Sequence, residues 1–215
     1  RLYADALAPV AQRFSFERGP SPGEVSGPPT VLLIGNHSSG KSSFINHLLD
    51  LDVQQTGLAP TDDAFSILSW GPEASERDGH ALISDPTLPY DGLGQFGPVL
   101  VSHARQRLRP HPLLRSVTLI DSPGMIDAAS QDSDRGYDFA DVVRWFAERA
   151  DLVLLFFDPD KPGTTGETLE VFTRSLLDLD HKLRVVMNKV DRFEGTHDFA
   201  RAYGTNNLPD CSNMC

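Results

Sequence analysis

Cysteines, long apolar runs and basic residues are all scarce in this sequence of 215 residues. Its two cysteines, Cys211 and Cys215, lie at the very end, so no disulfide framework is available and we expect a reducing, cytosol-like compartment. The longest uninterrupted apolar run, 152–157, is far shorter than the roughly 20 residues of a membrane-spanning helix. The 30 aspartates and glutamates outnumber the 19 lysines and arginines, and a net charge of −11 argues against a protein that coats nucleic acid.

The rest of the composition is that of an ordinary globular domain, with 40% hydrophobic and 23% charged residues. Short apolar runs alternate along the chain with longer stretches whose apolar residues recur at helical spacing. This alternation predicts an α/β fold with a mainly parallel sheet and helices on both of its faces. The predicted strands are 31–34, 64–70, 81–83, 117–120, 152–157 and 185–187, and the predicted helices are 41–50, 137–150 and 167–179.

The pattern changes at two points and predicts three segments. Apolar residues recur at helical spacing over 1–16, so 1–29 is predicted to be an N-terminal helix followed by a Pro- and Gly-rich linker. The α/β pattern covers 30–204, and 205–215 carries no pattern. Because the chain begins with Arg1 and the pattern breaks off near its end, we expect a trimmed or truncated chain.

The strongest motif is the run GNHSSGKS from Gly35 to Ser42, which follows a predicted strand and opens a predicted helix. It matches G-x-x-x-x-G-K-[ST] in the context that this phosphate-binding motif requires. Glycines let the backbone curl so that successive N–H groups point at phosphates, and the helix start adds the positive end of its dipole. Lys41 is predicted to reach the β- and γ-phosphates, and the Ser42 hydroxyl to bind Mg²⁺.

The second motif, DSPG, begins at Asp121 directly after the predicted strand 117–120. A carboxylate at the end of a neighbouring strand can hold Mg²⁺, usually through water. Gly124 can offer a backbone N–H to a γ-phosphate, so its loop would sense whether that phosphate is present. Alone such a run is a common turn, but its place on a strand after the first motif favours a nucleotide site.

The third motif, NKVD, runs from Asn188 to Asp191 after the last predicted strand. The Asp191 carboxylate can accept two hydrogen bonds from the N1–H and 2-amino groups of guanine, a pair of donors that adenine lacks. A surface turn of mixed charge is the alternative for these four residues alone. The three motifs in this order predict a P-loop nucleotide-binding domain of the GTPase type.

A fourth loop, PTDD at 60–63, lies between the first two motifs. In GTPase-like domains this loop supplies a threonine that closes over Mg²⁺ and the γ-phosphate, and Thr61 is the candidate. A Pro-initiated turn is an equal alternative. The polar run 131–135 is predicted to be a solvated loop. The predicted catalytic residues are Lys41, Thr61 and Gly124, the metal ligands are Ser42, Thr61 and Asp121, and the nucleotide-binding residues are Gly35, Asn36, His37, Ser38, Ser39, Gly40, Lys41, Ser42, Ser43, Asp121, Gly124, Asn188, Lys189 and Asp191.

Several of these stretches resemble the dynamin superfamily, and within it the branch of the EH-domain-containing ATPases and sarcalumenin. The runs RGYDF at 135–139 and FAER at 146–149 make the resemblance specific to that branch. It implies an incomplete dynamin-type G domain over 30–204, dimers or oligomers that depend on nucleotide, and a cytoplasmic protein peripheral on membranes. EH-domain proteins prefer ATP despite a similar N-K-x-D motif. The stretches that carry the resemblance are 30–49, 59–68, 119–127, 135–155 and 183–191.

Together, the motifs and the resemblance predict Mg²⁺-dependent binding and hydrolysis of GTP or ATP, linked to membrane remodelling or trafficking and without a nucleic-acid partner. The alternative is a non-hydrolysing nucleotide-binding scaffold of the sarcalumenin kind. Asp62 favours that alternative, because the family's loop reads P-T-T-D and a threonine would stand at this position. His37 also departs from the pattern, because dynamins proper place a catalytic glutamine there.

Overall fold

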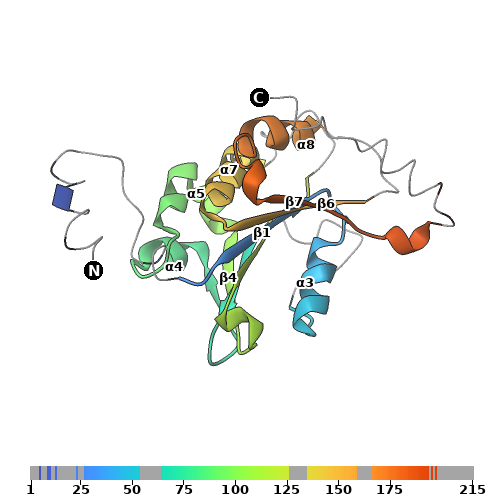
Figure 1. The fold of residues 1–215 in the computed structure, drawn as a ribbon. Helices are drawn as coiled ribbons and strands as arrows, with labels where there is room; N and C mark the ends of the chain where they lie inside the picture. The colour runs from blue at the N-terminus through green and yellow to red at the C-terminus, as the bar shows by residue number, and fades with distance from the viewer. Residues whose placement is uncertain are drawn as a thin grey trace.

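The computed structural model describes residues 27–53, 64–125, 135–158 and 166–193, together with isolated residues near both ends. The predicted N-terminal helix (1–16), most of the linker that follows it, and the tail 205–215 lie outside the described residues. The described strands form one sheet of seven, in the order β3-β4-β2-β5-β1-β6-β7 (Figure 1). The strands are β1 (Thr30–Gly35), β2 (Phe65–Trp70), β3 (Ser75–Asp78), β4 (Ala104–Arg109), β5 (Thr118–Asp121), β6 (Leu152–Phe157) and β7 (Leu183–Met187).

Parallel pairing dominates this sheet, as the sequence predicts. β1 lies in the interior of the sheet and pairs in parallel with β5 and β6, while β7 continues the parallel order beyond β6. β2 pairs in parallel with β4, but β2 against β5 and β3 against β4 are antiparallel. Because parallel strands need crossover connections, the helices lie on both faces of the sheet.

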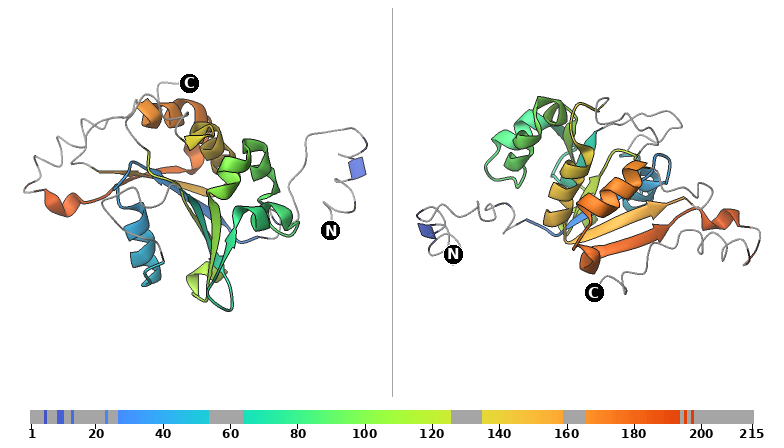
Figure 2. Two further views of the ribbon diagram at one scale, coloured as in Figure 1. Left: turned by 180° about the vertical axis from the view of Figure 1, so that it is seen from behind. Right: turned by 90° about the horizontal axis from the view of Figure 1, so that it is seen from above.

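The two faces of the sheet are covered by separate apolar clusters. Alternate side chains of β1 serve opposite faces, so Leu32 and Ile34 join one cluster while Leu33 joins the other. The helix α3 (Lys41–Leu49) packs Ile45 against the face of Leu33, and α7 (Phe139–Arg149) covers the opposite face. The views in Figure 2 show α3 on one side of the sheet and α7 with α8 (Gly166–Glu170) on the other. None of the helices in the described ranges is long and apolar enough to cross a bilayer.

One predicted strand is wrong and one predicted helix is too long. The run 81–83 belongs to the helix α4 (Gly79–Ser84), because the Asp78 side chain accepts a hydrogen bond from the Ala81 N–H at 2.8 Å and so caps a helix start. A run of three apolar residues does not distinguish a strand from one helical turn. The predicted helix 167–179 is α8 followed by a π-helical turn, Val171–Ser175, after which the helix ends.

The helix α7 has the face that its sequence predicts, and Asp138 caps its start. Val142, Val143 and Phe146 are buried, whereas Asp141 is exposed. The Asp138 carboxylate accepts a hydrogen bond from the Asp141 N–H at 2.9 Å, and its other oxygen pairs with the Arg174 guanidinium at 2.8 Å. Two short helices, α5 (Pro98–Ser102) and the 3₁₀ helix Asp91–Phe96, complete this side of the domain.

Replacing Asp138 by alanine should lower the free energy of unfolding by about 1 kcal/mol, because the first turn of α7 loses its cap. Urea denaturation followed by far-UV circular dichroism measures this loss. Asp138→Asn is the matched control, because asparagine retains the capping oxygen while losing the charge that faces Arg174. Equal losses in both variants would assign the stabilisation to the ion pair instead of the cap.

Candidate functional site

The predicted phosphate loop lies at the carboxyl ends of the parallel strands. It connects β1 to α3, next to the segment that follows β5 and close to the segments that follow β6 and β7. Because these strands run in one direction, their carboxyl ends meet at one edge of the sheet, where α/β folds bind ligands. The fold thereby brings three of the predicted motifs together at this edge. Thr61, predicted as a catalytic and metal-binding residue, lies outside the described residues.

Close backbone approaches require glycine at two positions of the loop. Gly40 has φ 98°, and a Cβ there would come within 2.1 Å of the Asn188 side-chain nitrogen. That nitrogen donates a hydrogen bond to the Ser39 carbonyl oxygen at 2.9 Å, so the third motif braces the first directly. A Cβ on Gly35 would meet the Phe156 carbonyl oxygen at 2.5 Å. The loop is thus held between β6 and the segment after β7.

The other serines and the histidine of the loop occupy different environments. Ser39 is fully buried, and its N–H donates to the Asn36 carbonyl oxygen at 3.1 Å. Ser38 adopts a left-handed conformation with φ 61°, and Ser43 is exposed on α3. The Nε2 atom of His37 is buried and has no hydrogen-bond partner among the described residues. Asn36, His37 and Ser38 are partly exposed, whereas Ser39 is enclosed by the domain.

Lys41 is a buried cation held by the phosphate loop itself. Its Nζ donates hydrogen bonds to the carbonyl oxygens of Gly35 at 2.8 Å and Asn36 at 3.3 Å, and the residue is only 6% exposed. Burial lowers the pKa of Lys41, the negative charge of Asp121 opposes that shift, and the positive charge of Arg135 adds to it. A buried ammonium whose charge is disfavoured by its surroundings favours the arrival of an anion.

Ser42 and Asp121 face one another at the start of α3 and the end of β5. The Ser42 hydroxyl donates to Asp121 Oδ2 at 2.9 Å, and Asp121 is only 5% exposed. A hydroxyl and a carboxylate are the hard oxygen ligands that Mg²⁺ prefers, and Mg²⁺ keeps several water ligands, so two protein groups suffice. Within the described ranges, no three or more His, Cys, Asp or Glu side chains are grouped so that they could hold a metal ion.

The segment that follows Asp121 packs directly on the phosphate loop. The Met125 N–H donates to the Gly35 carbonyl oxygen at 3.2 Å, and the His37 N–H donates to the Met125 carbonyl oxygen at 3.0 Å. A Cβ on Gly124 would lie 2.7 Å from the His37 Cα, so only glycine fits between the two segments. A displacement of one segment would therefore displace the other or break these contacts.

Two side chains of the third motif contact neighbouring segments, and a third is exposed to solvent. Lys189 has φ 58°, and its ammonium pairs at 2.6 Å with the carboxylate of Asp158, which directly follows β6. Asp191 lies in the 3₁₀ turn Val190–Arg192 and is exposed. Of the predicted nucleotide-binding residues here, Asn188 and Lys189 hold the edge of the sheet together and Asp191 is open to solvent.

Three residues near the phosphate loop were missed by the sequence reasoning. Arg135, predicted to lie in a solvated loop, has a side chain only 6% exposed, and its guanidinium pairs with Glu167 at 3.3 Å. The next residue of α8, Thr168, donates from its hydroxyl to Asn36 Oδ1 at 2.9 Å. The RGYDF run marked Arg135 as part of a resemblance, but no local signal pointed to α8 as a neighbour of the phosphate loop.

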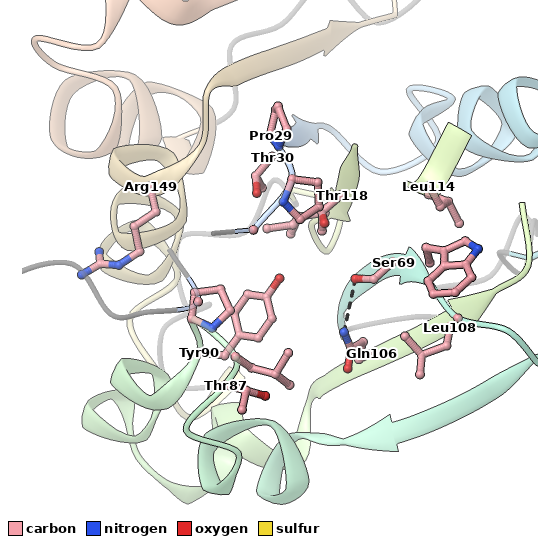
Figure 3. A pocket seen from close by; sticks show the side chains of 18 of the residues that line it. Pro29, Thr30, Ser69, Thr87, Tyr90, Gln106, Leu108, Leu114, Thr118 and Arg149 are labelled. Atoms are coloured by element: carbon pink, nitrogen blue, oxygen red, sulfur yellow. Dashed lines mark hydrogen bonds between the residues drawn. The ribbon is translucent and has the colours of Figure 1, made fainter. Parts of the chain in front are cut away.

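A cavity of about 1000 Å³ lies at the other end of the strands (Figure 3). Thr30 and Thr118, which start β1 and β5, line it together with Tyr90, whose pKa is raised by burial. Gln106 also lines it and donates to the Ser69 hydroxyl oxygen at 3.2 Å. The phosphate loop begins where β1 ends, about 17 Å along the strand, so this cavity is separate from the predicted nucleotide site.

Comparison with known proteins agrees with this arrangement. A family model described as "Dynamin family" matches residues 31–190. EH domain-containing protein 1 of Homo sapiens is 38% identical over 210 residues, which are 95% of this chain and 39% of that protein. EH domain-containing protein 2 of Arabidopsis thaliana is 36% identical over 95% of this chain and 38% of its own length. The chain therefore spans about two fifths of the curated relatives that it matches.

A solved structure of an oligomerised bacterial dynamin pair shares the fold. It superposes with a TM-score of 0.50 and 17% identity, covering 94% of this chain and 31% of the other. The family match extends from β1 into the third motif and so covers the segments that follow β1, β5 and β6 at the carboxyl edge of the sheet. The chain belongs to the dynamin family.

Proposed function

We propose that this chain binds a purine nucleoside triphosphate with Mg²⁺ and hydrolyses its terminal phosphate bond. The proposal depends on one observation at the carboxyl edge of the sheet. There the buried Lys41 lies beside the Ser42 hydroxyl, which donates to the Asp121 carboxylate at 2.9 Å. The loop supplies backbone N–H groups and a cation, and the pair supplies the oxygen ligands of a metal ion. A triphosphate with its Mg²⁺ needs all of these in one place.

The residues of this edge would act mainly by positioning. Lys41 would exchange the carbonyl oxygens of Gly35 and Asn36 for phosphate oxygens, and Ser42 and Asp121 would hold the metal ion. The Gly124 N–H would donate to the γ-phosphate. Bound Mg²⁺ would neutralise charge that develops on the phosphate oxygens. Water attack in line with the leaving group then needs little further chemistry from the protein.

A titration of the purified chain with fluorescent GTP and ATP analogues, with Mg²⁺ present and with Mg²⁺ chelated, tests this proposal. We expect saturable binding that weakens when the metal is removed. Inorganic phosphate and a nucleoside without phosphates are the controls, because neither should compete at low concentration. Absence of binding by either analogue would contradict the proposal.

The exposed Asp191 allows the base preference to be tested in the same assay. If its carboxylate accepts from N1–H and the 2-amino group, Asp191→Asn should weaken GTP about tenfold or more, change ATP little and improve binding of a xanthine nucleotide. Xanthine presents a carbonyl where guanine presents the 2-amino donor, and the asparagine amide can donate to it. Equal effects on all purines would show that Asp191 does not contact the base, and would favour the preference for ATP that the family resemblance implies.

A non-hydrolysing nucleotide-binding scaffold is the second candidate, and Asp62 favours it. A carboxylate 4 Å from a phosphate charge would be repelled by about 4 kcal/mol at an effective dielectric constant near 20, before any compensation by metal. Turnover measured with and without lipid vesicles separates the two candidates, because only a hydrolase releases phosphate.

Stimulation of turnover by vesicles, together with sedimentation of the protein with them, would support peripheral membrane association. Light scattering with and without nucleotide tests the proposed homodimer or oligomer.

A further inference from the structure

Arg135 is a buried arginine at the junction between the Asp121–Gly124 segment and α8. Its Nη2 donates to the Gly124 carbonyl oxygen at 2.8 Å, and its Nε lies 3.3 Å from the Glu167 carboxylate. The guanidinium also stacks over the ring of Phe139, with its carbon 4.3 Å from the ring centroid. Exposed ion pairs contribute little to stability. This pair is buried, and its burial carries a desolvation cost that an exposed pair does not have. The arrangement holds the guanidinium on three sides.

Arg135 makes its hydrogen bond to the carbonyl group of a residue whose backbone no side chain restricts. Gly124 has no side chain and many accessible backbone conformations. The guanidinium restrains its carbonyl group from one side, while the His37 backbone packs against its Cα from the other. The N–H group that precedes this carbonyl is the one that would meet a γ-phosphate. Its direction depends on the backbone angles that these contacts select.

The helix α8 connects this restraint to the phosphate loop. Glu167 pairs with Arg135, and its neighbour Thr168 donates to the Asn36 side-chain oxygen at 2.9 Å. Thr168 is buried, and the Glu167 side chain is only 9% exposed. Thr168 thus contacts the phosphate loop directly, whereas Glu167 reaches the Gly124 segment through Arg135.

We propose that Arg135, held by Glu167, is a positioning residue that orients the Gly124 backbone so that its N–H can donate to a third phosphate. The pair thereby makes the site favour a triphosphate over a diphosphate. This inference rests on the proposed nucleotide function and adds to it the residue responsible for sensing the terminal phosphate. Arg135 acts through Gly124, so its loss should change the discrimination between nucleotides more than the affinity for the part they share.

The test compares Arg135→Gln with Arg174→Gln. Arg174 is the matched control because it also bridges α7 and the α8 region, through Asp138, Asp141 and Glu170, but its side chain is 43% exposed. Dissociation constants are measured for a nucleoside diphosphate and for its non-hydrolysable triphosphate analogue with Mg²⁺. We expect Arg135→Gln to weaken the triphosphate about tenfold, the usual order for a lost hydrogen bond to a charged group, with the diphosphate within about twofold. Arg174→Gln should change neither constant.

Two further variants keep the test valid if Arg135→Gln does not fold. Arg135→Lys retains the charge and one donor and should recover part of the triphosphate preference. Glu167→Gln retains the shape of the residue that pairs with Arg135 while removing its charge. It should also reduce the preference for triphosphate over diphosphate. Thermal unfolding without nucleotide identifies any variant that has lost its fold.

The results separate failure of this inference from failure of the proposed function. Equal weakening of both nucleotides by Arg135→Gln, or no weakening of either, overturns the inference while wild-type binding leaves the proposed function standing. If the wild-type chain binds neither nucleotide, the proposed function fails and the inference fails with it. A selective loss of triphosphate affinity in both the Arg135→Gln and Glu167→Gln variants supports the inference.

Discussion

Replacing Lys41 by alanine should weaken triphosphate binding at least about hundredfold while the chain remains folded. In the structure the ammonium group lies inside the phosphate loop and donates to the carbonyl oxygens of Gly35 and Asn36. Charge-assisted hydrogen bonds to phosphate form in a site that excludes water, where about 3 kcal/mol corresponds to a factor of more than a hundred in affinity. Fluorescence titration measures the affinity, and circular dichroism measures the fold.

Lys182→Ala is the matched control for this variant. The Lys182 ammonium also donates to two backbone carbonyl oxygens, those of Glu148 and Ala150, each at 2.9 Å, but at the end of α7 away from the phosphate loop. Its loss should affect stability and leave nucleotide affinity unchanged. If Lys41→Ala binds triphosphate as well as the wild-type chain does, the phosphate-loop assignment is wrong.

Replacing Gly124 by alanine should reduce hydrolysis at least about hundredfold and leave most diphosphate affinity in place. The new Cβ would lie 2.7 Å from the His37 Cα and 3.0 Å from the His37 backbone nitrogen. Both atoms belong to the backbone, so neither can rotate away as the end of a side chain can. The segment must separate from the phosphate loop, which breaks the hydrogen bonds that join Met125 to Gly35 and His37. A loss of about 2.7 kcal/mol of transition-state stabilisation gives the hundredfold.

Gly94→Ala provides the comparison for Gly124→Ala. A Cβ at Gly94 would meet only Ile83 Cδ1, at the ordinary van der Waals distance of 3.9 Å. Phosphate release should therefore proceed at the wild-type rate in the Gly94 variant. Wild-type phosphate release by the Gly124 variant would show that this backbone does not approach the terminal phosphate.

Two strands that the sequence predicted well, β1 and β6, lie in the interior of the sheet. β1 and β6 are continuous apolar runs because helices cover both sides of the central sheet, and this burial requires apolar residues at every position. β4 was missed because its buried positions include Gln106 and Arg107. The Gln106 amide donates a hydrogen bond to the Ser69 hydroxyl and the Arg107 guanidinium donates to the Val53 carbonyl oxygen, contacts that no local pattern reveals. β3 was missed because all four of its residues are exposed at the edge of the sheet.

The phosphate-binding motifs were recognisable from the sequence because their chemistry is local. Gly35, Gly40 and Lys41 lie within one loop, and the conformations that this loop needs are restricted to few residue types. The expectation that Asp121 lies beside Ser42 followed from parallel strands ending at one edge, and the structure places these side chains 2.9 Å apart.

Contacts between distant segments were decided by the tertiary structure alone. Arg135 looked like part of a solvated run, yet its guanidinium is buried between Gly124 and Glu167, a residue 32 positions further along the chain. Thr168 reaches Asn36 across 132 positions. A side chain's partners depend on how the helices pack over the sheet, and that packing is a property of the whole core. The sequence by itself determined which loop is predicted to hold phosphate, because that motif is local. The packing of α8 over the sheet decided that Thr168 contacts this loop and that Glu167 pairs with the arginine beside Gly124.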